Sequence, residues 1–295
     1  MTATAADTTP FAVLARREIR HYATAPLFWV GVVLLVAQVV LSSVEENDGT
    51  SSTLTMIVPA ATLGLLGLIT MANLTHRSDR SAAAAGTTAI GESERTLALA
   101  AAIVVPVGVA LLWYTWAVVY FVAEPPADFV FPAGPVSTAY VLAVMFALSV
   151  MAAAGGPILG LVIARWLRFR GSTALATVLV VIVSILLQGN FESTWRWHVV
   201  WPWTYWYGPL GWETTGTGST SWVALPGSPI AWIGYLAALC VLGLPLALYH
   251  DPEGPRARLR TALLATGAVA AVLLVLTMTT GLADPWTHPL PGPSF

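Results

Sequence analysis

The sequence HRSDRSAAAAGTTAIGESER, from His76 to Arg95, is a polar segment between two long apolar runs. It holds six charged residues, in a chain of 295 residues that is 57% hydrophobic and only 9% charged. Soluble domains carry roughly 25% charged residues, so the composition indicates a membrane protein with several spans. Charges are costly inside a bilayer, and residues 75–97 are therefore expected to form a loop that a soluble partner can reach.

Seven apolar runs surround this loop, and each is long enough to cross about 30 Å of hydrocarbon as a helix. We therefore expect an all-α, polytopic membrane helix bundle. Within the fourth run, Gly155, Gly156 and Pro157 are expected to interrupt the helix, and Gly156 and Gly160 to let another helix approach closely. The runs are Pro26–Val44, Leu54–Leu74, Ala98–Ala123, Pro135–Ala164, Ser172–Gly189, Pro229–Tyr249 and Thr261–Gly281.

The arginines predict the orientation of the bundle. All 13 basic residues are arginine, and twelve of them fall in four segments that alternate correctly between the runs. Short loops rich in basic residues stay on the cytoplasmic side. We therefore expect a multi-pass protein of the cell membrane with its N-terminus in the cytoplasm and its C-terminus outside. Residues 250–295 would then form a basic cytoplasmic loop, the seventh helix and an outer tail.

Residues 1–25 precede the first run and are predicted to carry an amphipathic surface helix. Phe11, Ala15, Ile19 and Tyr22 fall on one face of that helix, and charged residues fill the others. The alternative is a short basic flank that only fixes the orientation of the first span. Within residues 76–95, two helices separated by a bend are expected, and Ser93 is the expected N-cap of the second.

The residue types exclude several kinds of chemistry. The chain has no lysine, so it cannot form a Walker-type phosphate loop or a Schiff base. Its five histidines are scattered through the loops without metal-ligand spacing, and the seven runs contain no ionisable residue that could carry a coupling ion. We therefore expect no enzyme, no cofactor, no metal and no nucleic acid, and an energy source outside the chain.

The polar segment reads R-x-x-R-x-x-x-x-x-G-T-T from Arg77 and S-E-R-T-L-A-L-A from Ser93. Together with the helix before the first span and the large outer loop before the sixth, this pattern resembles the permease subunits of type-2 ABC exporters. The resemblance covers roughly residues 8–249. It implies a bacterial protein with a six-helix exporter-like core at residues 26–249, to which this chain adds a seventh, C-terminal transmembrane helix.

The resemblance also implies the partners. Such a permease dimerises, with a second copy or a different permease chain, and docks its second-to-third loop, the coupling helix, into a separate ATPase subunit. The ATPase activity would then reside in that partner. The residues that would line the dock are Arg77, Arg80, Gly86, Thr87, Glu92, Ser93, Glu94 and Arg95. The plain alternative is a solvated hairpin whose charges only set the topology.

The outer loop, residues 190–228, holds seven of the 13 tryptophans of the chain. One interpretation is an interfacial belt that anchors the fold in the lipid headgroups. The other is an outer gate or substrate surface formed by Trp201, Trp203 and Trp206. The expected function is export of a hydrophobic or amphiphilic substrate, such as a drug, peptide or lipid. The alternatives are a non-transporting membrane anchor or accessory subunit and, less favoured, a channel or scramblase.

Overall fold

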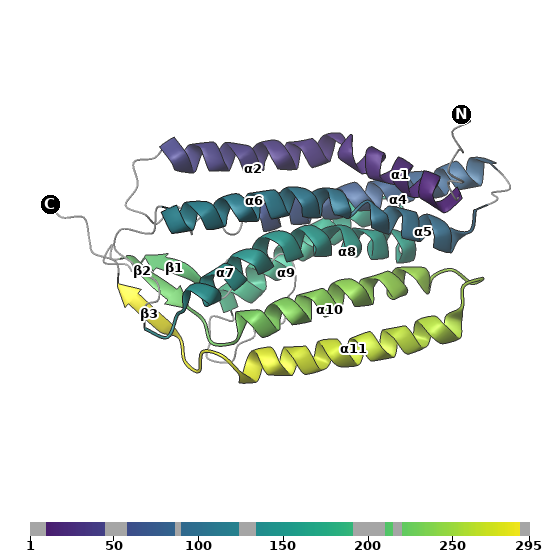
Figure 1. The fold of residues 1–295 in the computed structure, drawn as a ribbon. Helices are drawn as coiled ribbons and strands as arrows, with labels where there is room; N and C mark the ends of the chain where they lie inside the picture. Colours follow the sequence, from purple (N-terminus) through teal and green to yellow (C-terminus); the bar gives the residue numbers. More distant parts are fainter. Residues whose placement is uncertain are drawn as a thin grey trace, which may run out of the picture.

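The computed structural model describes residues 10–44, 58–85, 90–123, 134–190, 210–214 and 220–289, which are mostly helical (Figure 1). In chain order the first helices are α1 (Pro10–Ala23), α2 (Pro26–Val44), the π-helical segment η2 (Ala60–Leu65), α4 (Leu66–Ala85), α5 (Glu92–Ala101) and α6 (Val104–Ala123). They are followed by α7 (Thr138–Phe146), the π-helical segment η3 (Ala147–Met151), α8 (Ala152–Trp166), α9 (Ser172–Asn190), α10 (Pro229–Leu248) and α11 (Arg256–Thr279).

The long helices have the length and hydropathy of membrane spans. Four in the described residues qualify on their own, at Glu92–Ala123, Thr138–Trp166, Pro229–Leu248 and Arg256–Thr279. A fifth is obtained if α1 and α2, which meet at a 52° bend, are counted as one broken span. The helices lie roughly alongside one another in a bundle (Figure 1). The chain is therefore a membrane protein with a helical bundle, as its composition predicts.

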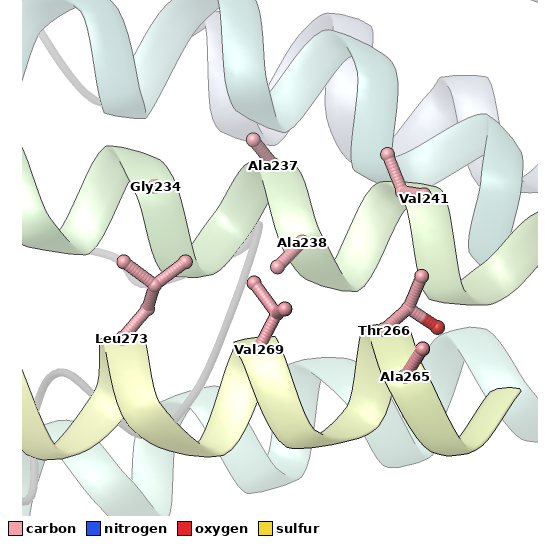
Figure 2. Close-up of a pocket in the computed structure, with 8 residues that line it drawn as sticks. All are labelled: Gly234, Ala237, Ala238, Val241, Ala265, Thr266, Val269 and Leu273. Atoms are coloured by element: carbon pink, nitrogen blue, oxygen red, sulfur yellow. The ribbon is translucent and has the colours of Figure 1, made fainter. Parts of the chain in front are cut away.

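The outermost helix pair shows the surface expected of spans that face lipid. Helices α10 and α11 pack on each other, and a groove of about 320 Å³ runs between them (Figure 2). Its lining is almost wholly apolar and includes Gly234, Ala238, Val269 and Leu273. Val269 and Val241 beside it are more than half exposed. Large exposed apolar side chains of this kind are stable in a bilayer and unfavourable in water.

Helix α1 has the predicted amphipathic character, but much of its inward face packs on protein. Tyr22 is fully buried and contacts the ring of Phe28 at the start of α2, and Glu18 is also buried. Across this face α1 packs on α5 and also on α4, which carries Arg77, the ion-pair partner of Glu18. Phe11, which the sequence places on the same face, is 40% exposed. Trp29 closes the elbow between α1 and α2 by donating its indole N–H to the carbonyl of Ala23 at 2.8 Å.

The centre of the bundle is formed by α4, η2 and α8, which pack backbone to backbone. A Cβ atom added at Gly156 would collide with the carbonyl oxygen of Gly64, and one at Gly160 with that of Leu68. The predicted close approach at these two glycines is therefore confirmed. The predicted interruption is wrong, because α8 runs without a break through Pro157, and the irregular backbone is the π-helical segment η3 that precedes it.

A small antiparallel sheet at one end of the bundle was not predicted, and in this detail the all-α prediction is wrong. Strands β1 (Leu210–Thr214) and β2 (Thr220–Ala224) come from the tryptophan-rich loop, and β3 (Trp286–Pro289) comes from the C-terminal tail. In the register, Trp212 lies opposite Trp222, which lies opposite His288. The sheet therefore ties the tail to the loop, and we call this the sheet end of the bundle (Figure 1).

Candidate functional site: an ionic network at the other end of the bundle

Charged side chains from four separate segments meet at the end of the bundle opposite the sheet. They are brought there by the C-terminal half of α4, the first turn of α5, the last turn of α8 with the turn after it, and the connection from α10 to α11 (Figure 1). We call this cluster the ionic network; its members are Asp79, Glu92, Ser93, Arg165, Arg168, His250 and Asp251.

Arg165 is the centre of the network, and its side chain is completely buried. Its Nη1 donates to Oδ1 of Asp79 at 2.5 Å and lies 4.0 Å from Oε1 of Glu92. Two further donors of the same guanidinium, Nε and Nη2, are buried without a hydrogen-bond partner among the described residues. Burying donors without partners costs free energy. The site therefore holds Arg165 in place although part of its hydrogen-bonding capacity is unused.

Glu92 is the second branch point, at the first position of α5. Its Oε1 accepts from Nδ1 of His250 at 2.7 Å, and its Oε2 accepts from Nη2 of Arg168 at 3.0 Å. Burial works to raise the pKa of Glu92, but the bond to His250 and the charges of Arg165 and Arg168 outweigh it, so the pKa lies below its ordinary value. A carboxylate at a helix N-terminus is further stabilised by the helix dipole.

Asp251 joins the connection between α10 and α11 to the start of α5. Its Oδ2 accepts from the hydroxyl of Ser93 at 2.6 Å and from the backbone amide of Ser93 at 3.0 Å. The expected N-cap role of Ser93 is therefore wrong, because Gly91 holds the N-cap position and the capping carboxylate comes from 158 residues further along the chain. Burial would raise the pKa of Asp251, but its hydrogen bonds to Ser93 and to the amide of Glu253 lower it overall.

The residues predicted to line the dock divide into two groups. Glu92 and Ser93 face inward and belong to the ionic network, whereas Arg80 and Glu94 are exposed. Gly86 and Thr87 lie outside the described residues. The predicted gate residues Trp201, Trp203 and Trp206 also lie outside them.

Two further arginines of the predicted dock have partners within the chain. Arg77 lies 3.6 Å from Oε2 of Glu18 on α1, and its side chain is 43% exposed. Arg95 donates to the carbonyl of Ile90 at 2.9 Å. Both arginines therefore contribute to the fold at this end of the bundle as well as to its charge.

Sequence reasoning did not find five members of the network. A signal was available for the region, because the arginine count places residues 76–95, 165–170 and 250–260 on one side of the membrane. Opposite charges gathered on one side can pair, but neither the choice of partners nor the burial of Arg165 follows from the count. The missed residues are Asp79, Arg165, Arg168, His250 and Asp251.

The network pairs carboxylates with arginine, histidine and serine side chains. Among the described residues, no group of three or more histidine, cysteine, aspartate or glutamate side chains is arranged to hold a metal ion. Comparison of the chain with family models, with curated proteins and with solved structures finds no match.

Proposed function

We propose that the chain is the membrane-spanning permease subunit of an ABC exporter and moves a hydrophobic or amphiphilic substrate. A separate ATPase subunit would supply the energy at residues 76–95, and a second permease chain would complete the path. In this proposal the seven apolar runs are seven spans, the ionic network lies on the cytoplasmic side and the sheet lies outside. Those runs contain no ionisable residue. Transport driven by an ion gradient needs such a residue to carry the ion, so this absence favours an energy source outside the chain.

The observation that carries the proposal is the way the ionic network ties the α4–α5 hairpin to the rest of the bundle. The start of α5 is bonded through Glu92 and Ser93 to Arg168, His250 and Asp251, which belong to the ends of α8 and α10. A partner that displaces this hairpin would therefore move at least two other spans with it. Such a mechanical connection is what a transporter needs when its fuel is consumed in another subunit.

The hairpin also offers an accessible surface for such a partner. Arg80, Ser81, Ala83 and Ala84 in the last turns of α4 are exposed, as is Glu94 in the first turn of α5. This surface carries both charge signs, which gives an interface orientation as well as affinity. The exposed residues and the members of the ionic network therefore lie next to one another in the same short segment.

The experiment is co-purification with the ATPase subunit that the proposal expects to be encoded beside this chain, using the double charge reversal Arg80→Glu and Glu94→Arg. Both side chains are exposed, so the variant is expected to insert and fold normally but to lose the ATPase. The matched control, Glu253→Arg with Arg258→Glu, reverses two exposed side chains at the same end of the bundle, also without a change of net charge, and should retain the partner. Unchanged ATPase association in the Arg80 and Glu94 variant would remove this surface as the dock and favour an anchor or accessory role.

A further inference from the structure

We call the end of the bundle that carries the ionic network the ionic end. A second polar feature there is a cleft of about 370 Å³ between the α1–α2 elbow and α4. Its volume is within the range of small-molecule sites. One part of the lining is cationic or polar and the other is apolar. The residues that matter for the argument are His21, Ala25, Leu27, Leu74, Arg77 and Arg80.

The polar part of the cleft carries excess positive charge. Arg17, Arg20, Arg77 and Arg80 act on or line it, and the acidic side chain described against them is Glu18, which lies 3.6 Å from Arg77. The other nearby carboxylate, Asp79, is bonded to Arg165.

The pKa of His21 is sensitive to this positive charge. Burial lowers its pKa first, and the charges of Arg77, Arg17 and Arg20 lower it further. Its Nε2 accepts a hydrogen bond from Nε of Arg17 at 3.2 Å, which requires that ring nitrogen to be unprotonated. An anion bound in the cleft would therefore relieve repulsion that Glu18 compensates only in part.

The start of α2 adds a further positive element. The helix begins at Pro26, and its backbone bond from the amide of Trp29 reaches back to the carbonyl of Ala25. Leu27, which lines the cleft, therefore lies in the first turn of α2, whose free amides form the positive end of the helix dipole. Helix N-termini of this kind bind phosphate groups when cationic side chains are also present.

The position of the cleft along the helices indicates the kind of anion. On α4, apolar Leu74 is followed within three residues by His76 and Arg77, and on α2 the apolar run begins at Leu27. The cleft therefore lies where the surface changes from apolar to charged. Trp29, half exposed beside it, is a residue type enriched at the level of lipid headgroups.

We propose that this cleft binds an anionic phospholipid from the membrane leaflet at the ionic end. Its phosphate lies against Arg77, Arg80 and the start of α2, and an acyl chain follows Leu27 and Leu74. A diester phosphate supplies the missing negative charge, and the acyl chain covers the apolar part of the lining. The inference concerns the chain alone and does not depend on an ATPase or on transport.

The test is a titration of the purified full-length chain in detergent with dioleoyl phosphatidylglycerol, with bound lipids counted by native mass spectrometry. The Arg77→Gln and Arg80→Gln double variant is expected to bind the first lipid about thirtyfold more weakly, and Arg80→Gln alone about fivefold, from the usual effect of one surface arginine. The matched control, Arg258→Gln with Arg260→Gln, removes the same charge at the same end of the bundle and is expected to change this binding by less than about twofold.

Each outcome decides the proposal. Equal weakening in the control would show only a general attraction of the lipid to a basic surface, and no weakening in Arg80→Gln would show that Arg80 does not contact the lipid. Either result would overturn the proposal. Arg80 is exposed and bonds the carbonyl of His76 on its own helix, so Arg80→Gln remains decisive if loss of the Arg77–Glu18 pair unfolds the double variant. Competition arms use dioleoyl phosphatidylcholine and glycerol phosphate. Displacement of the lipid by glycerol phosphate at equal concentration would contradict a role for the acyl chain.

Discussion

Replacement of Arg165 by methionine tests whether the ionic network is an interior feature of the bundle. Methionine keeps most of the length and the apolar stem of arginine and removes the charge. The variant leaves Asp79 without the cation that it bonds at 2.5 Å, whereas Glu92 keeps its bonds to Arg168 and His250. The main loss is therefore one buried ion pair.

The size of the effect follows from burial. Removal of one partner from a buried pair typically costs about 3–5 kcal/mol. The side chain of Arg165 is fully buried, but that of Asp79 is 26% exposed and can regain water, so we expect about 2–3 kcal/mol for Arg165→Met. Asp79→Asn should lower the free energy of unfolding by a similar amount. It leaves the buried guanidinium of Arg165 with Glu92, 4.0 Å away, as its remaining carboxylate. The loss of unfolding free energy in the double variant should then be about 2 kcal/mol smaller than the sum of the losses in the two single variants.

The assay is a reversible denaturant titration in detergent micelles, followed by tryptophan fluorescence. It compares the wild type, Arg165→Met, Asp79→Asn and the double variant. Arg258→Met, at an exposed position on α11, is the control and should stay within about 0.5 kcal/mol of the wild type. A coupling energy below about 0.5 kcal/mol between Arg165 and Asp79 would refute the reasoning, because exposed ion pairs give values of that size.

Three further predictions use the same unfolding assay. Gly156→Ala should cost about 1–3 kcal/mol of unfolding free energy, because its methyl group meets the backbone of Gly64. Gly267→Ala on α11, where nothing lies within 4 Å, should be neutral or stabilise by up to about 1 kcal/mol. Equal effects of the two substitutions would contradict the close packing at Gly156. Ser93→Ala should cost about 1.5 kcal/mol by removing the hydroxyl bond to Asp251, and no loss would mean that the backbone bond suffices. The folded-state pKa values of Glu92 and Asp251 are lowered, so their contribution is complete above about pH 4.5 and is lost as the pH falls through the folded values; stability that is level from pH 6 to pH 3 would contradict this.

The helices could be predicted from the sequence because the hydrophobicity of a stretch determines whether it forms a membrane helix. The sequence predicts the first apolar run at Pro26–Val44, and α2 has these bounds; it predicts the sixth at Pro229–Tyr249, and α10 ends one residue earlier. A stretch without charges has to satisfy its backbone polar groups within a helix when it enters lipid. The sequence predicts that the second run ends at Leu74, whereas α4 continues to Ala85, because the alanine-rich polar stretch is itself a strong helix former.

The pairing of charges and strands could not be predicted, because it depends on contacts between distant parts of the chain. Ser93 and Asp251 are separated by 158 residues, and so are Glu92 and His250. The sheet likewise joins residues near 212 and 222 to a strand near 288. Tryptophan is common in strands and also at membrane interfaces, so the loop composition alone favoured the interfacial interpretation. A single sequence records which residues are present and not which ones meet.

The packing at the centre of the bundle extends the connection made by the ionic network. Gly156 and Gly160 let α8 approach the backbone of η2 and α4 too closely for either to slide without the other. At the end that carries the ionic network, Arg165 and Asp79 join α8 to α4 again, and Glu92 adds α5 through Arg168.

A displacement of the α4–α5 hairpin should therefore move α4, α5 and α8 together and also pull on the end of α10 through His250 and Asp251. The π-helical segments η2 and η3 contact each other along this unit, and such segments are often found at functional sites in helices. Under the proposed function, loss of Arg165 should then preserve binding of the ATPase at the exposed face of the hairpin and reduce transport. Loss of binding and transport together would instead mean that the network only supports the dock.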